Sequence, residues 1–189
     1  MKKASGFTLI ELMLTIAIFA IVVAAAAPSM ADFVNRYRSE AKGRALFDLL
    51  FLMRAKAYSE GRNYSLCPSS DGNNCSGDWA AGVLLFADED GDGERDDGET
   101  IERTLPRLEE NASLSWRAFN NRGYLIFRPS GTTPSQSGNF AYCPGSGEAK
   151  YGWFIILNKI GRPYFGKDSD GDGIVENGSG DNLDCGADG

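Results

Sequence analysis

The chain has no histidine among its 189 residues. That absence excludes His-dependent catalytic triads, His metal ligands and His pH switches. Basic residues are also the minority, with 19 Lys and Arg against 26 Asp and Glu, so the net charge is −7. This balance provides no general attraction for nucleic acid or for an anionic membrane surface. The sequence also has no glycine-rich phosphate loop and no nucleophile–base pair, so we expect a protein that is not an enzyme and requires no cofactor.

Charge is almost absent from residues 4–30, where Glu11 is the only charged side chain. Residues 31–62 carry seven basic and four acidic residues, a net charge of +3. Residues 63–189 carry ten basic and 21 acidic residues, a net charge of −11. The sequence therefore predicts three zones, namely a membrane segment, a helix and an acidic domain.

Residues 7–27 are apolar except for Thr8, Glu11 and Thr15. A helix of this length spans roughly 31 Å, about one hydrocarbon core. Lys2 and Lys3 precede it, which predicts a single-pass membrane protein whose N-terminus is cytoplasmic and whose remaining chain faces outward. A secretory signal peptide is the alternative, but its apolar region is normally about 7–15 residues long. A simple anchor would leave the Glu11 carboxylate in lipid, where charge is costly.

The N-terminal motif resembles the processing signal of type IV prepilins and type II secretion pseudopilins. It reads Lys2-Lys3-Ala-Ser-Gly6 and then Phe7-Thr-Leu-Ile-Glu11. The resemblance implies that a prepilin peptidase removes a leader of residues 1–6 by cutting between Gly6 and Phe7, and that the new N-terminus of Phe7 is methylated. It also implies that Glu11 pairs with the N-terminal amine of a neighbouring subunit during assembly.

A helix is predicted to continue out of the membrane over residues 31–60. Apolar residues recur there at spacings of three or four, which predicts one buried stripe. Its members are Phe33, Tyr37, Ala41, Ala45, Leu49, Leu52 and Met53. Gly61 suits a C-terminal cap, and Gly43 is expected to weaken the helix.

Short apolar runs separated by turn residues follow and predict antiparallel strands. They are residues 64–66, 82–87, 100–105, 114–118, 124–128, 140–143 and 153–157. The predicted fold class is α+β, with one long N-terminal helix packed on an antiparallel β-sheet. We divide the chain into a leader (1–6), a transmembrane and assembly half-helix (7–28), an amphipathic half-helix (29–61) and a β-rich domain (62–189), whose acidic tail begins at about residue 167.

Within the pilin class, the chain is similar to the FimT/FimU/GspH group of minor pilins and pseudopilins. The supporting motifs, in chain order, are Leu66-Cys67-Pro68-Ser69, Cys75, Asp78-Trp79, Gly82-Val83-Leu84-Leu85-Phe86, Phe127-Arg128-Pro129-Ser130-Gly131, Tyr142-Cys143, Gly161-Arg162 and Cys185. The resemblance implies the pilin fold and a low-abundance initiator or tip subunit of a type IV pilus. It equally allows a minor pseudopilin of type II secretion. The implied partners are other major and minor pilins or pseudopilins, and the prepilin peptidase.

The four cysteines all lie in the exported part of the chain, where disulfides are the default. Four cysteines allow three pairings, and we favour Cys67–Cys75 with Cys143–Cys185. Loop closure predicts roughly 2.6 kcal/mol for the first bond and roughly 4 kcal/mol for the second. A Cys₄ zinc site is the alternative.

Two acidic segments resemble calcium loops. In the first segment, residues 88–99, side chains with oxygen ligands fall at the template positions, and glycine occupies position 6. Its candidate ligands are Asp88, Asp90, Asp92, Glu94, Asp96 and Glu99. The alternative is a solvated acidic hairpin tip that binds no ion. The second segment, residues 168–179, repeats only the first half and has Ser179 at the last ligand position. It predicts either a weaker calcium site or a disordered tail.

DNA binding is the alternative function from a different class. Some FimT-like pilins bind DNA through a Gly-Arg-x-Arg motif, and the matching stretch here is Gly161-Arg162-Pro163-Tyr164, without the second arginine. The remaining basic candidates are Lys159, Arg162 and Lys167. Residues 168–189 carry seven acidic and no basic side chains, so we expect weak DNA binding at best.

Overall fold

A computed structural model describes residues 6–119 and 122–186. The chain divides into two compact units, Met1–Arg38 and Ser39–Gly189. The elements are α1 (Leu9–Glu60), β1 (Tyr64–Pro68), η1 (Trp79–Ala81), β2 (Val83–Ala87), β3 (Ile101–Leu105), β4 (Ser113–Ala118), β5 (Leu125–Phe127), β6 (Gly138–Cys143), η2 (Ala149–Tyr151), β7 (Trp153–Leu157) and β8 (Pro163–Phe165).

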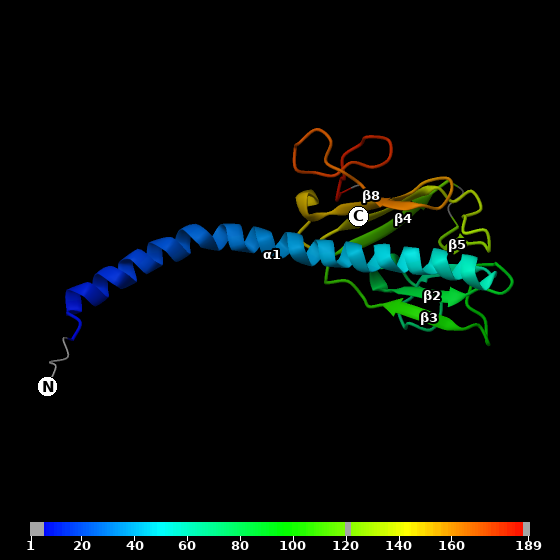
Figure 1. The fold of residues 1–189 in the computed structure, drawn as a ribbon, viewed down its shortest axis with the longest axis horizontal. Coiled ribbons are helices and arrows are strands. Elements are labelled where there is room, and N and C mark those ends of the chain that lie inside the picture. The colour runs from blue at the N-terminus through cyan, green and yellow to red at the C-terminus, as the bar shows by residue number, and fades with distance from the viewer. Residues whose placement is uncertain (1–5, 120–121, 187–189) are drawn as a thin grey trace. The chain divides into compact units, whose positions relative to one another are not determined.

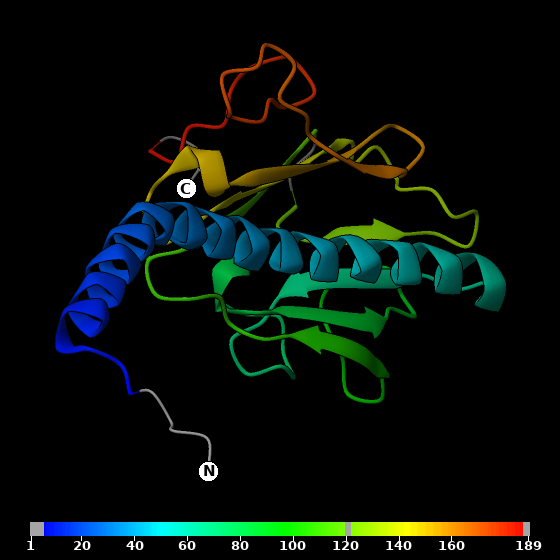
Figure 2. The same ribbon diagram turned by 60° about the vertical axis from the view of Figure 1, so that its left-hand side comes forward.

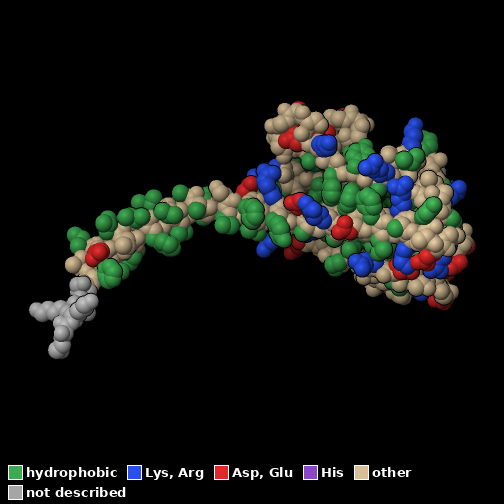
Figure 3. Space-filling model, viewed as in Figure 1, with side chains coloured by type: hydrophobic (Ala, Val, Ile, Leu, Met, Phe, Trp, Pro, Cys, Tyr) green, Lys and Arg blue, Asp and Glu red, His purple; other side chains and the backbone are tan. Residues whose placement is uncertain are grey.

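The first unit holds the apolar part of α1. Its large hydrophobic side chains are exposed from Phe7 to Val23, and Figure 3 shows this stretch as a largely green surface. By length and composition the helix can cross a membrane. Pro28 lies inside the helix and does not end it.

The second unit contains two four-stranded antiparallel sheets, with strand orders β3-β2-β1-β5 and β4-β6-β7-β8. Figures 1 and 2 show the second half of α1 lying across strands of both sheets. All seven predicted strands are present, so the expected α+β class with a long helix on antiparallel strands is confirmed. The sequence predicted a single sheet, whereas the strands divide between two. The eighth strand, β8, was missed because it is a three-residue run that begins with proline.

One hydrophobic core joins the helix to both sheets. Leu46, Leu50 and Met53 of α1 are buried in the same cluster as Leu66 of β1 and Phe140 of β6. A polar cluster flanks this core, since Lys42 donates to the Tyr142 hydroxyl and forms an ion pair with Glu109. Tyr142 in turn donates to Glu109 at 2.6 Å. Burial raises the pKa of the Tyr142 phenol, and Glu109 raises it further, so the tyrosine remains a donor.

The buried face of the helix differs from the predicted stripe. Phe33 and Tyr37 are 64% and 66% exposed, and Ala41 and Ala45 are exposed as well. The helix residues that are buried are Ser39, Gly43, Leu46, Leu49, Leu50, Met53 and Ala57. The prediction holds for Leu49 and Met53, which are buried, and was wrong from Phe33 to Ala45, because it placed apolar residues on the buried face by their spacing alone. Instead, the buried face begins with small residues that admit an indole ring.

Trp153 explains why small residues lie on that face. Its indole Nε1 donates to the Ser39 carbonyl at 3.1 Å, and the Ser39 hydroxyl donates to the Tyr151 carbonyl. A Cβ atom placed on Gly43 would lie 3.1 Å from two indole atoms and 3.2 Å from the Phe165 ring. Gly43 is therefore a packing requirement, which outweighs its low helix propensity.

We predict that Gly43→Val destabilises the protein by about 1–3 kcal/mol, because overpacking forces neighbouring side chains from their rotamers. Ala45→Val, two residues along on the exposed side of the helix, is the matched control and should change stability by about 0.5 kcal/mol or less. Chemical denaturation of the detergent-solubilised chain, followed by tryptophan fluorescence, measures both. Equal stability of the two variants would contradict the packing at Gly43.

Candidate functional site

The processing signal lies just outside the start of α1. Gly6 and Phe7 precede the helix, and the Phe7 side chain is 87% exposed. The Gly6–Phe7 bond therefore lies in non-helical, exposed chain. The leader residues 1–5, including Lys2 and Lys3, lie outside the described residues.

Thr8 caps the N-terminus of α1, a role that the sequence analysis missed. Its hydroxyl accepts the backbone N–H of Glu11 at 3.3 Å. The signal that could have revealed it is the pattern Thr-x-x-Glu ahead of an apolar run, which is typical of a capping box. This cap places Glu11 in the first turn of the helix, where the positive end of the helix dipole favours an acidic side chain.

The Glu11 carboxylate is exposed, and no hydrogen bond or ion pair joins it to another of the described residues. Its neighbours along the helix are Leu9, Ile10, Leu12 and Met13, all exposed and apolar. A carboxylate in such surroundings would become desolvated in lipid or in a helix bundle. It then requires a cation, and one monomer supplies none from its described part.

The two disulfides join Cys67 to Cys75 and Cys143 to Cys185, the pairs favoured from the sequence. The first closes the loop after β1. The second ties the acidic tail to the end of β6, where Cys143 is buried with Leu183 of the tail.

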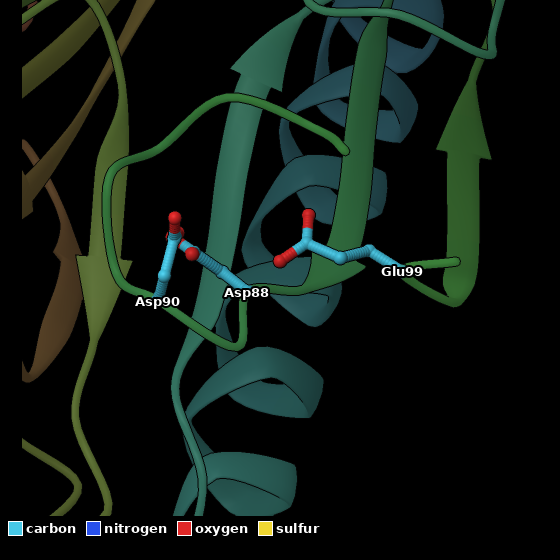
Figure 4. A group of neighbouring side chains, drawn as sticks. All are labelled: Asp88, Asp90 and Glu99. Atoms are coloured by element: carbon cyan, nitrogen blue, oxygen red, sulfur yellow. The ribbon is translucent and has the colours of Figure 1, made fainter. Parts of the chain in front are cut away.

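Three of the six candidate calcium ligands converge in the first acidic loop, residues 88–99 (Figure 4). Carboxylate oxygens of Asp88, Asp90 and Glu99 lie within 4.8 Å of one another. Asp92, Glu94 and Asp96 lie outside that cluster. The Asp92 carboxylate instead accepts the N–H of Glu94, while the N–H of Asp96 donates to Glu99. Three carboxylates form the hard, oxygen-only donor set that calcium prefers.

Asp88 is fully buried at the base of this loop. It accepts hydrogen bonds from the Ser65 hydroxyl and from the N–H groups of Gly91 and Gly93. Burial raises the pKa of the Asp88 carboxyl, and these three donors oppose the rise. Asp88 therefore connects the acidic loop to strand β1.

The second acidic loop repeats the backbone pattern of the first. Asp168 accepts the N–H groups of Gly171 and Gly173, as Asp88 accepts those of Gly91 and Gly93. Asp170 and Asp172 accept the N–H groups two residues on, as do Asp90 and Asp92 in the first loop.

Glu176 replaces the missing last ligand of the second loop. It accepts the N–H of Ser169, as Glu99 accepts that of Glu89, although it comes three positions earlier than the template requires. Oxygens of Asp168, Asp170 and Glu176 also lie within 4.8 Å of one another. The sequence analysis searched position 179 and found serine, because fixed spacing assumes a loop of fixed length. The expected disordered tail is instead a folded loop, closed by pairing of Glu176 with Lys167 and Asn182.

The three DNA candidates lie on either side of β8 in the chain. Lys159 and Arg162 lie in the turn between β7 and β8 and are exposed. Lys167 follows β8 and pairs through its backbone with Glu176, so the second acidic loop begins at the next residue. Carboxylates beside Lys167 oppose the approach of a phosphate backbone.

Two family models match the chain. One, described as type II transport protein GspH, matches residues 42–161, and one described as a prokaryotic N-terminal methylation motif matches residues 1–27. No curated protein matches the chain significantly.

Solved structures show the same fold. The type IV minor pilin FimU of Pseudomonas aeruginosa has 20% identity and a TM-score of 0.55, over 81% of this chain and 98% of FimU. The minor pseudopilin EpsH of the Vibrio cholerae type II secretion system has 11% identity and a TM-score of 0.51, over 71% of this chain and 99% of EpsH.

Proposed function

The chain belongs to the GspH family, and from that premise we propose that it is a minor pilin of a type IV pilus, acting as an initiation or tip subunit. In this role a prepilin peptidase cuts between Gly6 and Phe7, and Phe7 becomes the methylated N-terminus. The apolar half of α1 first anchors the protein in the inner membrane, with the domain in the periplasm. It then packs among other pilins in the filament. The proposed role is structural, with no catalytic step.

The observation that supports this proposal best is the isolated Glu11 carboxylate on an exposed apolar helix. An unpaired carboxylate inside a membrane is costly, on the order of 2.5 kcal/mol or more at the centre. Cleavage after Gly6 creates a positively charged amine on every subunit. A neighbour's amine can neutralise Glu11 only after assembly, so the charge pair would couple incorporation to correct axial position.

We predict that Glu11→Gln lowers incorporation into filaments about tenfold or more, because the amide keeps the shape and loses the charge. Processing at Gly6 should be unchanged, since the cleavage site remains intact. Thr15→Ala is the matched control one turn along the helix. The Thr15 hydroxyl already donates to the Leu12 carbonyl, so its loss should not affect assembly. Immunoblots of sheared filaments against whole-cell protein measure incorporation, and mass spectrometry measures processing. Normal incorporation of Glu11→Gln would refute the pairing.

A minor pseudopilin of type II secretion is the second candidate, favoured by the description of the matching family model. Deleting the gene in its host separates the two. The pilus proposal expects loss of surface pili with protein secretion intact. Loss of protein secretion with intact pili would contradict the pilus proposal and would identify the protein as a pseudopilin of type II secretion.

We also propose that the first acidic loop binds calcium through Asp88, Asp90 and Glu99, and that the second binds it through Asp168, Asp170 and Glu176. The support is the convergence of three carboxylates in each loop on one oxygen-only cluster. Mutual repulsion of these carboxylates is relieved by a divalent cation. Bound calcium would stabilise the loops that precede β3 and follow β8.

Calcium at 100 times its Kd should raise the free energy of unfolding by about 2.7 kcal/mol for each occupied site, which corresponds to roughly 5–10 °C in Tm per site. Asp90→Asn and Asp170→Asn should each reduce that shift, since both residues are exposed ligands whose replacement leaves the fold intact. Asp97→Asn, in the first loop and outside the cluster, should keep the full shift. Thermal unfolding of the full chain in detergent, with EDTA or calcium, measures it. An unchanged Tm at millimolar calcium would exclude both sites.

A further inference from the structure

A cavity of about 600 Å³ opens at the loop end of the second unit, where β4, β5 and β7 end. Phe119 follows β4, Arg128 follows β5, and Lys159 follows β7, and all three line it. The strands that carry these residues belong to both sheets. Its volume falls in the range of about 300–1,000 Å³ that is typical of small-molecule sites.

The charged groups of this cavity are both cationic. Of the described residues, Arg128 and Lys159 line it, and no acidic side chain from the described part of the chain does. Among the described residues, neither side chain forms an ion pair or a hydrogen bond, although the chain carries an excess of carboxylates. In Figure 3, several blue Lys and Arg side chains lie on the end of the molecule near β5. Two unpaired cations on one cavity favour an anionic ligand, and the arginine fork fits a carboxylate or a phosphate.

Hydroxyl groups form the polar part of the wall. Ser130 and Thr132 lie 2.8 Å apart through their hydroxyls and are open to a ligand. Thr133 is 5% exposed, and its hydroxyl has no hydrogen-bond partner in the described part of the chain. Hydroxyl side chains both donate and accept, and buried polar groups normally have partners. These groups match the hydroxyls of a sugar ring.

Phe119 supplies the apolar surface of the cavity. Its side chain is 75% exposed, so the ring is accessible to a ligand in the cavity. An exposed ring at the mouth of a polar cavity can cover the apolar face of a sugar ring, so the site combines apolar contact with polar recognition.

We propose that this cavity binds an acidic sugar, with the carboxylate of a uronate held by Arg128 and Lys159, its hydroxyls by Ser130 and Thr132, and its ring against Phe119. A single carboxylate fits better than a row of phosphates. A second cavity of about 170 Å³ shares Arg128 and Pro134 with the first and is lined by both Asp90 and Arg122, so the surface beside the first cavity has mixed charge and is not a purely basic track for a polyanion. The net charge of −11 on residues 63–189 disfavours a nucleic acid as well.

The test measures binding of D-glucuronate to the full chain in a zwitterionic detergent without a sugar headgroup, by ligand-observed NMR or calorimetry. D-glucose, which lacks the carboxylate, is the matched probe and should bind at least tenfold more weakly. Arg128→Ala and, separately, Lys159→Ala should each weaken glucuronate about tenfold with Tm unchanged, since both side chains are exposed. Arg107→Ala, an exposed arginine outside the cavity, is the control and should bind normally.

Three outcomes would overturn the proposal. Equal binding of glucose and glucuronate would remove the role of the cations. Glucuronate binding unaffected by either cavity variant would place the ligand elsewhere. A single-stranded oligonucleotide that binds more tightly than glucuronate, and loses that binding in Arg128→Ala, would reassign the cavity to nucleic acid.

Discussion

The burial of one face of α1 between residues 39 and 57 against both sheets is the constraint on which the domain depends. Each sheet has only four strands, and their apolar faces meet in a cluster that includes Leu46, Leu50 and Met53. Gly43 and Ser39 allow Trp153 to approach the helix backbone, which sets the position of β7. The loops that carry the acidic clusters and the cavity extend from these sheets, so their geometry follows from how the helix packs.

The elements of this fold were predictable from the sequence, but the contacts between them were not. The N-terminal motif and strand spacing were sufficient for the fold class. The helix face was misplaced because periodicity records where large apolar residues lie, whereas the closest contact here uses Ser39 and Gly43. Phe33 and Tyr37 are apolar and helical in spacing, yet both are exposed. Apolar residues at helical spacing therefore fit a surface that contacts another molecule as well as they fit a buried core.

The acidic loops show a different limit of sequence reasoning. The template predicted six ligands in the first loop by counting positions, and three of them converge. In the second loop the same counting led to Ser179, while the chain supplies Glu176 through a loop three residues shorter. Backbone turns at Asp88 and Asp168 are identical in pattern, because each carboxylate binds the N–H groups three and five residues on. The two acidic loops are therefore equivalent in their local hydrogen bonds, although the spacing of their acidic residues differs.

The two units differ in whether the chain itself covers their apolar helix surface. In residues 39–186 the helix face is covered by the chain's own sheets, whereas residues 7–27 leave theirs exposed. Exposed apolar surface of that extent requires lipid or neighbouring chains. Lipid alone satisfies every residue of the segment except Glu11, whose carboxylate it opposes. Under the proposed function a bundle of processed subunits would satisfy both, because it would offer apolar packing together with an amine beside each carboxylate. In that proposal the same helix resides in a membrane before assembly and is held more favourably in a filament, because only the filament neutralises Glu11.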